Sequence, residues 1–145
     1  MTQIIRVIDD LPDGFDALLA DAVAEGVRNM TLLADQWASG EQRFDGPDEG
    51  LFAALIGGEL AAIGGVTVET GAGEPAMRMR RLYVRPAFRR SGLGRVLAGA
   101  MMQQGFAVAP LLTANARATA AAPVFWEAMG FELVGMAAFT HRLRR

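Results

Sequence analysis

The run RRSGLGR at residues 89–95 constrains the fold of this chain most. It lies between an apolar run from Met77 to Val84, which predicts a strand, and a helical apolar pattern from Leu93 to Gln104. A loop that opens a helix presents backbone N–H groups without intrahelical acceptors, and such a loop binds anions. Gly92 and Gly94 let a ligand approach the main chain, and the three arginines of the run are cationic donors that suit phosphate. The run therefore predicts a phosphate-binding loop.

Composition limits the chemistry that such a loop can support. With 145 residues, 52% of them hydrophobic, the chain is long enough for one core, and we expect a single domain over residues 1–145. It has no cysteine and one histidine, His141, which excludes a disulfide framework, a thiol nucleophile and a Cys/His zinc site, so we expect no metal. All 14 cations are arginine, so the lysine of an ATP-binding P-loop is missing.

The N-terminal segment does not resemble a targeting sequence. Asp9 and Asp10 follow a short apolar stretch that lacks the basic flank of a signal peptide. No apolar run approaches the roughly 18 residues of a membrane span. We expect a soluble, cytoplasmic protein without a membrane partner.

Charge is segregated along the chain. Up to Ala76, three arginines accompany fourteen acidic residues, whereas from Met77 onward eleven arginines accompany only Glu127 and Glu132. A solvated surface would explain either half alone. The separation is explained more simply by two ligand preferences, an anion for the second half and a cation for the first.

Periodicity and turn residues predict the remaining elements. Asp13 is the expected N-cap of the first helix, which Gly26 ends, and Gly57-Gly58 is the expected turn of a hairpin. The expected strands are Thr2–Ile8, Leu51–Ile56, Glu59–Glu69, Val108–Ala114, Phe131–Val134 and Ala137–Leu143, and the further helices are Val27–Ala38 and Phe125–Met129, the last with Gly130 as its stop.

The strand before the loop has an irregular pattern. Met77 and Met79 share one face by alternation, and Leu82 and Val84 share one face, but the two pairs are out of phase by one residue. A β-bulge near Arg80-Arg81 would place all four apolar side chains on the same side. Because a bulge also frees backbone groups, we expect a ligand cleft beside the anion loop.

Several motifs together resemble the GNAT superfamily of N-acetyltransferases. Residues 88–94 resemble its acyl-CoA loop (Arg or Gln, two residues, Gly, one residue, Gly or Ala), and Leu82-Tyr83-Val84 resembles the strand before that loop. Residues 125–131 resemble its last helix, and Leu51 to Val68 its central hairpin. The resemblance covers most of the chain. It implies an α/β (α+β) fold, a central mixed sheet of about six to seven strands flanked by about four helices and splayed at the bulged strand Met77–Val84.

The resemblance also implies acetyl-CoA as co-substrate. Backbone N–H groups from about Arg90 to Arg95 would hold the CoA pyrophosphate, and the Val84 N–H would polarise the thioester carbonyl. The expected CoA contacts are Leu82, Tyr83, Val84, Arg89, Arg90, Ser91, Gly92, Leu93, Gly94, Arg95, Asn115 and Phe125. Four neighbouring arginines are either a solvated face or contacts to the nucleotide phosphates: Arg78, Arg80, Arg81 and Arg85.

The catalytic positions depart from the family pattern. Trp126 stands where the family usually carries a tyrosine acid, and an indole N–H is a hydrogen-bond donor with no useful acidity. A thiolate of pKa roughly 8.5 is already a fair leaving group, so turnover does not require that acid. Glu69 is the carboxylate that we expect as base. In the structural alternatives, Trp126 and Tyr83 are packing aromatics, Glu69 is a strand-end residue and His141 an ordinary strand residue.

The function indicated is an acetyl-CoA-dependent N-acetyltransferase, in which a primary amine of a small molecule or peptide attacks the thioester directly. The alternative, motivated by Trp126, is a non-catalytic acyl-CoA-binding or regulatory module of the same fold. The acidic first half favours a cationic acceptor, and a homodimer is compatible with the sequence. Nucleic acid is not an expected partner, because the overall charge is −2 and the basic half lacks interleaved aromatics.

Overall fold

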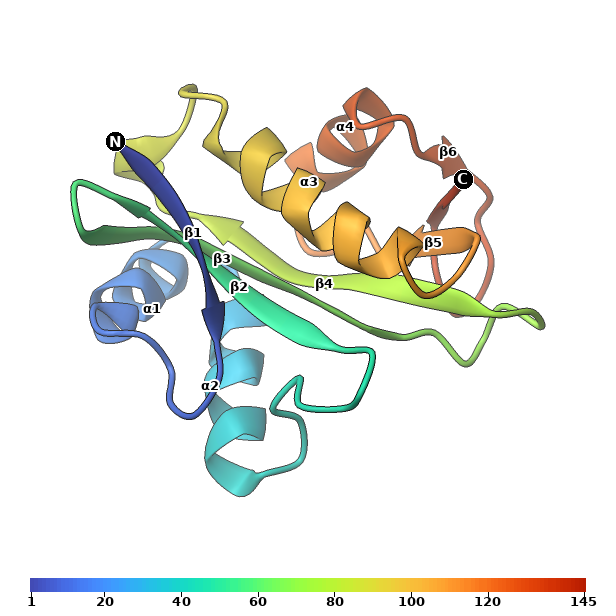
Figure 1. Ribbon diagram of the computed structural model, residues 1–145. Coiled ribbons are helices and arrows are strands. Elements are labelled where there is room, and N and C mark those ends of the chain that lie inside the picture. The colour runs from blue at the N-terminus through green and yellow to red at the C-terminus, as the bar shows by residue number, and fades with distance from the viewer.

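A seven-stranded mixed sheet runs through the computed structural model, which describes all 145 residues (Figure 1). Its strands are β1 (Thr2–Val7), β2 (Gly50–Ile56), β3 (Glu59–Val68), β4 (Ala76–Val84), β5 (Leu111–Ala114), β6 (Glu132–Leu133) and β7 (His141–Arg144). Its helices are α1 (Phe15–Ala24), α2 (Asn29–Ser39), α3 (Leu93–Phe106) and α4 (Ala121–Ala128), with a short 3₁₀ turn at Pro86–Phe88. The number of strands and helices agrees with the predicted fold class.

The strand order is β1-β2-β3-β4-β5-β7-β6. Neighbours are antiparallel except β4 and β5, which are parallel and are joined through α3. Gly57 and Gly58 both have positive φ, 58° and 84°, as a two-residue hairpin turn between β2 and β3 requires. The predicted hairpin and the predicted strand–loop–helix–strand unit are therefore both present.

The helices form two layers. Figure 1 shows α1 and α2 on one face of the sheet and α3 and α4 on the other. Each layer buries its own apolar cluster, one that includes Leu18, Met30 and Trp37 and another that includes Leu97 and Met101. None of the helices combines the length and the apolarity needed to cross a membrane.

The ends of the first two helices differ from the prediction. The N-cap of α1 is Gly14, at φ 89°, and no side chain caps the helix, so Asp13 does not have the predicted role. α2 begins at Asn29 because the Val27 N–H is used to close α1: it donates to Ala22 O at 2.9 Å, while the Gly26 N–H donates to Val23 O at 3.0 Å. This pair of bonds is a Schellman motif, with Gly26 as its left-handed residue.

The second half also shows shifted boundaries. α3 continues through Gly105, where a Cβ would lie 2.6 Å from Leu112 Cδ2, so this glycine permits contact with the sheet instead of ending the helix. β5 begins only at Leu111, because the N–H groups of Val108 and Ala109 bond back to Gly105 O. α4 begins earlier than predicted, at Ala121, but Gly130 ends it as expected, with a second Schellman motif.

The predicted bulge in β4 is confirmed. The register of β3 and β4 passes from Ile63↔Tyr83 to Gly65↔Arg80, so β4 has one extra residue there, and Arg81 takes a positive φ of 56°. Pairing between β4 and β5 stops at Met79↔Ala114, which leaves the last residues of β4 without a strand neighbour on that side. The sheet is therefore open next to the loop that follows β4.

Candidate active site

Three cavities follow the open edge of β4 from the start of α3 to the space between α2 and α4. Their volumes are about 290, 420 and 390 Å³, and we call them the loop cavity, the middle cavity and the arginine cavity. Val84, Arg89 and Phe125 line both the loop and the middle cavities. Asn29, Leu82 and Trp126 are among the residues that line both the middle and the arginine cavities. The cavities thus form one continuous cleft.

The loop cavity has the geometry of an anion site. No N–H group from Arg90 to Arg95 donates a hydrogen bond within the protein. Gly92 is the N-cap of α3 at φ 80°, a conformation that glycine adopts without strain, and a Cβ there would meet open space. The free amides lie at the positive end of a helix of 14 residues, which favours a negatively charged group.

The three arginines of the loop have different surroundings. Arg90 and Arg95 are exposed and line the loop cavity. Arg89 lines it as well, but its guanidinium donates to both carboxylate oxygens of Glu25, at 2.6 and 2.8 Å, and its Nε donates to Val84 O at 3.0 Å. Arg89 therefore joins the loop to the end of α1, and its charge is paired with Glu25 within the protein.

Glu25 also holds the hydroxyl of Tyr83. Tyr83 donates to Glu25 Oε1 at 2.5 Å, and its ring lies 5.6 Å from the Arg89 guanidinium carbon. The hydrogen bonds from Arg89 and Tyr83 lower the pKa of Glu25, whereas burial and the Glu25 carboxylate raise the pKa of Tyr83. Tyr83 thus stays protonated, with its hydroxyl hydrogen directed at Glu25. It is therefore a poor candidate for a proton donor in the middle cavity.

The junction of the middle and arginine cavities lies at Leu82. Asn29 Nδ2 donates to Leu82 O at 3.2 Å, and Asn29 Oδ1 is buried without a partner. The junction therefore offers an unused acceptor. Val84, predicted to polarise the thioester, lies one step further toward the loop, between the middle and loop cavities.

Trp126 forms part of the wall at the same junction. Its side chain is 6% exposed and packs edge-on against Phe125 and Phe131, with ring centroids 5.1 and 5.0 Å away. This is the packing role considered as an alternative in the sequence. Phe125, an expected CoA contact, lies beside Gly94: a Cβ on that glycine would come within 3.2 Å of its ring.

Two other candidate residues lie outside the cleft. Glu69 lines none of the three cavities, and its oxygens are 2.9 Å from the Thr113 hydroxyl and 2.9 Å from the Gly71 N–H, both of which donate to it. The position therefore corrects the prediction that Glu69 is the base. His141 is buried, with its ring nitrogens 2.7 Å from the Thr140 hydroxyl and 2.8 Å from Glu127, and takes no part in the cleft.

The arginine cavity is lined by five arginines and by no carboxylate. They come from the start of α2, from β4 and from the segment after β5: Arg28, Arg78, Arg80, Arg81 and Arg117. Arg81 donates to Gln36 Oε1 at 3.2 Å and Arg117 to Asn115 Oδ1 at 2.8 Å, so their partners within the protein are neutral. Asn115, an expected CoA contact, lies in this cavity and not in the loop cavity.

Burial and mutual repulsion perturb these side chains. Burial, together with the charges of Arg80 and Arg78, lowers the pKa of Arg81 to about 10. Burial and the charge of Arg78 also lower the pKa of Arg80. The Nε atoms of Arg78 and Arg81 are buried without an acceptor. Sequence reasoning did not assign Arg28, Asn29 or Arg117 to the site, because α2 and the segment after β5 approach β4 only in the folded chain.

Comparison with known proteins identifies the family. The model described as the acetyltransferase (GNAT) family matches residues 16–131. No curated protein sequence matches the chain significantly.

Solved structures match the fold over the whole chain. A presumptive acetyltransferase from Exiguobacterium sp. 255-15 superimposes with a TM-score of 0.87 at 27% identity, covering 99% of this chain and 93% of that one. Glucosamine-6-phosphate N-acetyltransferase from Arabidopsis thaliana has a TM-score of 0.67 at 19% identity, covering 94% and 95%. A variant of the AtaT toxin, bound to the C-terminus of the antitoxin AtaR and acetyl-CoA, has a TM-score of 0.69 at 15% identity, covering 99% and 92%. Because the family model spans most of the chain and the sheet, bulge and loop all agree with it, the protein belongs to the GNAT family of acetyltransferases.

Proposed function

We propose that the protein is an acetyl-CoA-dependent N-acetyltransferase that acts on a primary amine. The observation that carries this proposal is the continuity of the cleft: a cradle of unbonded amides from Arg90 to Arg95 leads along the unpaired end of β4 to a separate cavity at Leu82. The first part suits a pyrophosphate, the second an extended arm, and the third a second substrate.

The chain's own groups fit acetyl-CoA along this path. The free amides and the exposed Arg90 and Arg95 would hold the pyrophosphate. The middle cavity, with Val84, Phe125 and Trp126 in its walls, would take the pantetheine arm beside the strand edge. The thioester would then lie at the junction near Leu82, where the two cavities meet, rather than beside Val84.

The reaction needs little from side chains. The nitrogen lone pair of a neutral amine forms the new C–N bond, the C–S bond breaks, and its electron pair leaves with sulfur. The proton that the nitrogen gives up passes through water to bulk solvent or to the thiolate. Asn29 Oδ1, buried and unpaired at the junction, is placed to accept a hydrogen bond from the amine and so direct its lone pair.

The decisive experiment follows free thiol released from acetyl-CoA in the presence of a panel of primary amines, with the acetylated product identified by mass spectrometry. Amine-dependent thiol release supports the proposal. If acetyl-CoA binds in a calorimeter but no amine is acetylated, the alternative stands: a non-catalytic acyl-CoA-binding module, which the replacement of the usual tyrosine by Trp126 favours.

A further inference from the structure

We infer that the acceptor carries a phosphate or carboxylate group in addition to the amine that is acetylated. That an amine is acetylated rests on the proposed function; that the cavity binds an anion does not. The arginine cavity, about 390 Å³ in volume, has five arginines and no carboxylate among its lining residues. A cavity of this composition selects anions. A cationic acceptor, the expectation from the acidic first half of the sequence, would meet repulsion there.

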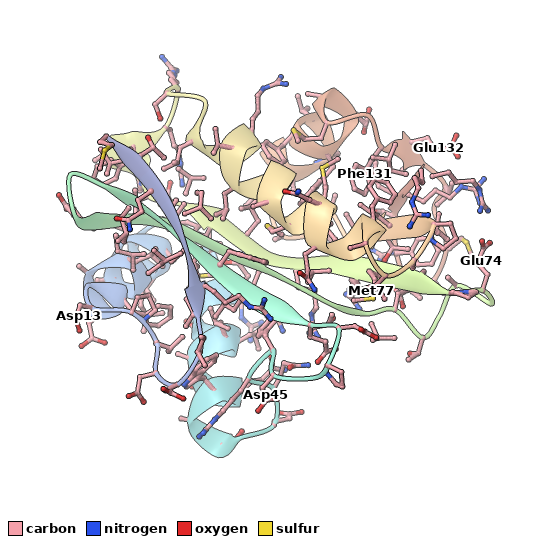
Figure 2. The ribbon with its side chains drawn as sticks, in the orientation of Figure 1. Asp13, Asp45, Glu74, Met77, Phe131 and Glu132 are labelled. Atoms are coloured by element: carbon pink, nitrogen blue, oxygen red, sulfur yellow. The ribbon has the colours of Figure 1, made fainter.

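Acidic residues of the first half of the sequence form ion pairs away from the arginine cavity. Asp21 and Glu59 accept hydrogen bonds from Arg85, and Glu25 is paired with Arg89. Asp13 and Asp45 are exposed and lie in the layer of α1 and α2, near its outer edge, as Figure 2 shows. These five acids therefore pair with arginines outside the arginine cavity or face solvent, and none of them lines it.

Carboxylates near the cluster do not neutralise it either. Glu49 and Glu69 act on Arg80 through their charge, but neither forms an ion pair with it. Glu49 Oε2 accepts from the Val68 N–H at 3.0 Å, and Glu69 is held by Thr113 and Gly71. No carboxylate of the protein therefore lines this cavity or forms an ion pair with its arginines, and Glu49 and Glu69 offset only part of the charge on Arg80.

Buried donors without acceptors point to a ligand. The Nε groups of Arg78 and Arg81 are buried and make no hydrogen bond, and an unsatisfied buried donor costs more than an exposed one. An oxyanion bound by these two arginines would supply acceptors that the protein itself does not provide. The repulsion that lowers the pKa values of Arg80 and Arg81 would be relieved by the same group.

The phosphates of CoA do not account for these arginines. The loop cavity has its own amides and its own arginines, and it shares no lining residue with the arginine cavity. The middle cavity lies between the two. An acyl-CoA that places its pyrophosphate at Gly92 would therefore reach the arginine cavity only with its acyl end. Because the acetyl group of the proposed donor is uncharged, an anion in this cavity would belong to the other substrate.

The first test compares matched acceptors. Glucosamine 6-phosphate against glucosamine, and phosphoethanolamine against ethanolamine, are pairs that share the same amine and differ by one phosphate. We expect the anionic member of each pair to have a kcat/KM about tenfold to hundredfold higher, the range of one or two charged hydrogen bonds. Equal or higher kcat/KM for the neutral members would overturn the inference while leaving the acetyltransferase proposal intact.

The second test does not depend on catalysis. Inorganic phosphate is titrated at constant ionic strength against the wild type, Arg81→Met, Arg78→Met and the matched control Arg144→Met, and the unfolding temperature is followed with and without saturating CoA. Arg144 pairs with Glu74 on the surface and lines no cavity, so its replacement removes the same charge without touching the site.

We expect phosphate to stabilise the wild type and Arg144→Met, even with CoA bound, and to stabilise either cavity variant much less. Such a result supports the anion site even if no amine is acetylated, in which case only the acetyltransferase proposal fails. If CoA abolishes the effect of phosphate in the wild type, or if Arg81→Met and Arg78→Met respond like Arg144→Met, the arginine cavity is not the acceptor's anion site.

Discussion

Replacing Arg81 by Met should make the protein more stable. The positive charge of Arg81 is half-buried and close to Arg80 and Arg78, and these surroundings lower its pKa from the usual value of an arginine to about 10. A charge held in a site that opposes it destabilises the folded state. Met retains the unbranched stem and the positive φ of 56° at this position, so the substitution isolates the charge.

The magnitude follows from the pKa. The fall of the Arg81 pKa from its usual value to about 10 corresponds to about 3 kcal/mol of unfavourable free energy, which partial exposure and screening by salt reduce to about 1–2 kcal/mol. Losing the hydrogen bond to Gln36 Oε1 removes about 0.5–1 kcal/mol of stability. The net gain is about 1 kcal/mol, or about 3 °C in Tm for a domain of this size.

The sign of the pH dependence provides an additional check. Because the folded-state pKa of Arg81, about 10, lies below the unfolded value, the unfolded wild type binds more protons as the pH rises above about 10, and the wild type gains stability there. The advantage of Arg81→Met is therefore complete below pH 10 and shrinks above it.

Thermal and urea unfolding at pH 7.5, 9 and 10.5 measure this advantage, with Arg144→Met as the charge-matched surface control. A Tm for Arg81→Met that is lower than that of the control at pH 7.5 would refute the reasoning, because it would make the arginine a structural residue.

Three further predictions concern the loop and its surroundings. Gly92→Ala should lose about 1–2 kcal/mol of stability, because its φ is 80°, and should bind CoA more weakly in a calorimeter. The control Gly99→Ala, inside α3 with open space at the Cβ, should gain about 0.5–1 kcal/mol of stability. Equal stability and equal CoA affinity of the two variants would contradict the role of the loop. Trp126→Phe should leave kcat within about threefold if the thiolate leaves unaided, while lowering Tm through lost packing; a drop in kcat of about 100-fold would make the indole a participant in the chemistry. The ion pair with Arg89 lowers the pKa of Glu25, so its contribution to stability is complete above pH 4.5 and is lost as the pH falls through the lower folded value; acid titration of Glu25→Gln should show a shallower loss than the wild type.

The parts of the fold that local pattern determines were predictable. The phase change between Met79 and Leu82 located the bulge of β4, and the two glycines of the hairpin and Gly92 of the loop carry the positive φ that only glycine adopts easily. Helix ends were less predictable. The apolar pattern predicts a second helix from Val27, but in the structure the Val27 N–H donates to Ala22 O and so terminates the first helix. Asp13 likewise satisfied the composition of an N-cap without its geometry.

The site was only half predictable for a related reason. The loop is continuous in sequence, so its free amides could be inferred from residues 89–95 alone. The arginine cavity is assembled from α2, β4 and the segment after β5, and nothing local links Arg28 or Arg117 to Arg81. The segregation of charge along the sequence did indicate an anion site. Several acids of the first half, however, pair with arginines of the second half in the folded chain, so only the arginines that remain without an acidic partner point to a ligand.

The positive charge of the arginine cavity would affect catalysis as well as recognition of the acceptor. Five guanidinium groups exceed the one or two charges of a phosphate or carboxylate, so the cavity remains positive with an anionic acceptor in place. A positive site disfavours an ammonium group and lowers its pKa, which raises the share of neutral amine that can attack. The proton is then lost to water before attack, and a dedicated carboxylate base is not required. The arginines would thus both bind the acceptor and keep its nitrogen neutral. This role explains why Glu25 is the only carboxylate that lines the middle and arginine cavities, although it is held by Arg89 and Tyr83 and is not free to act as a base.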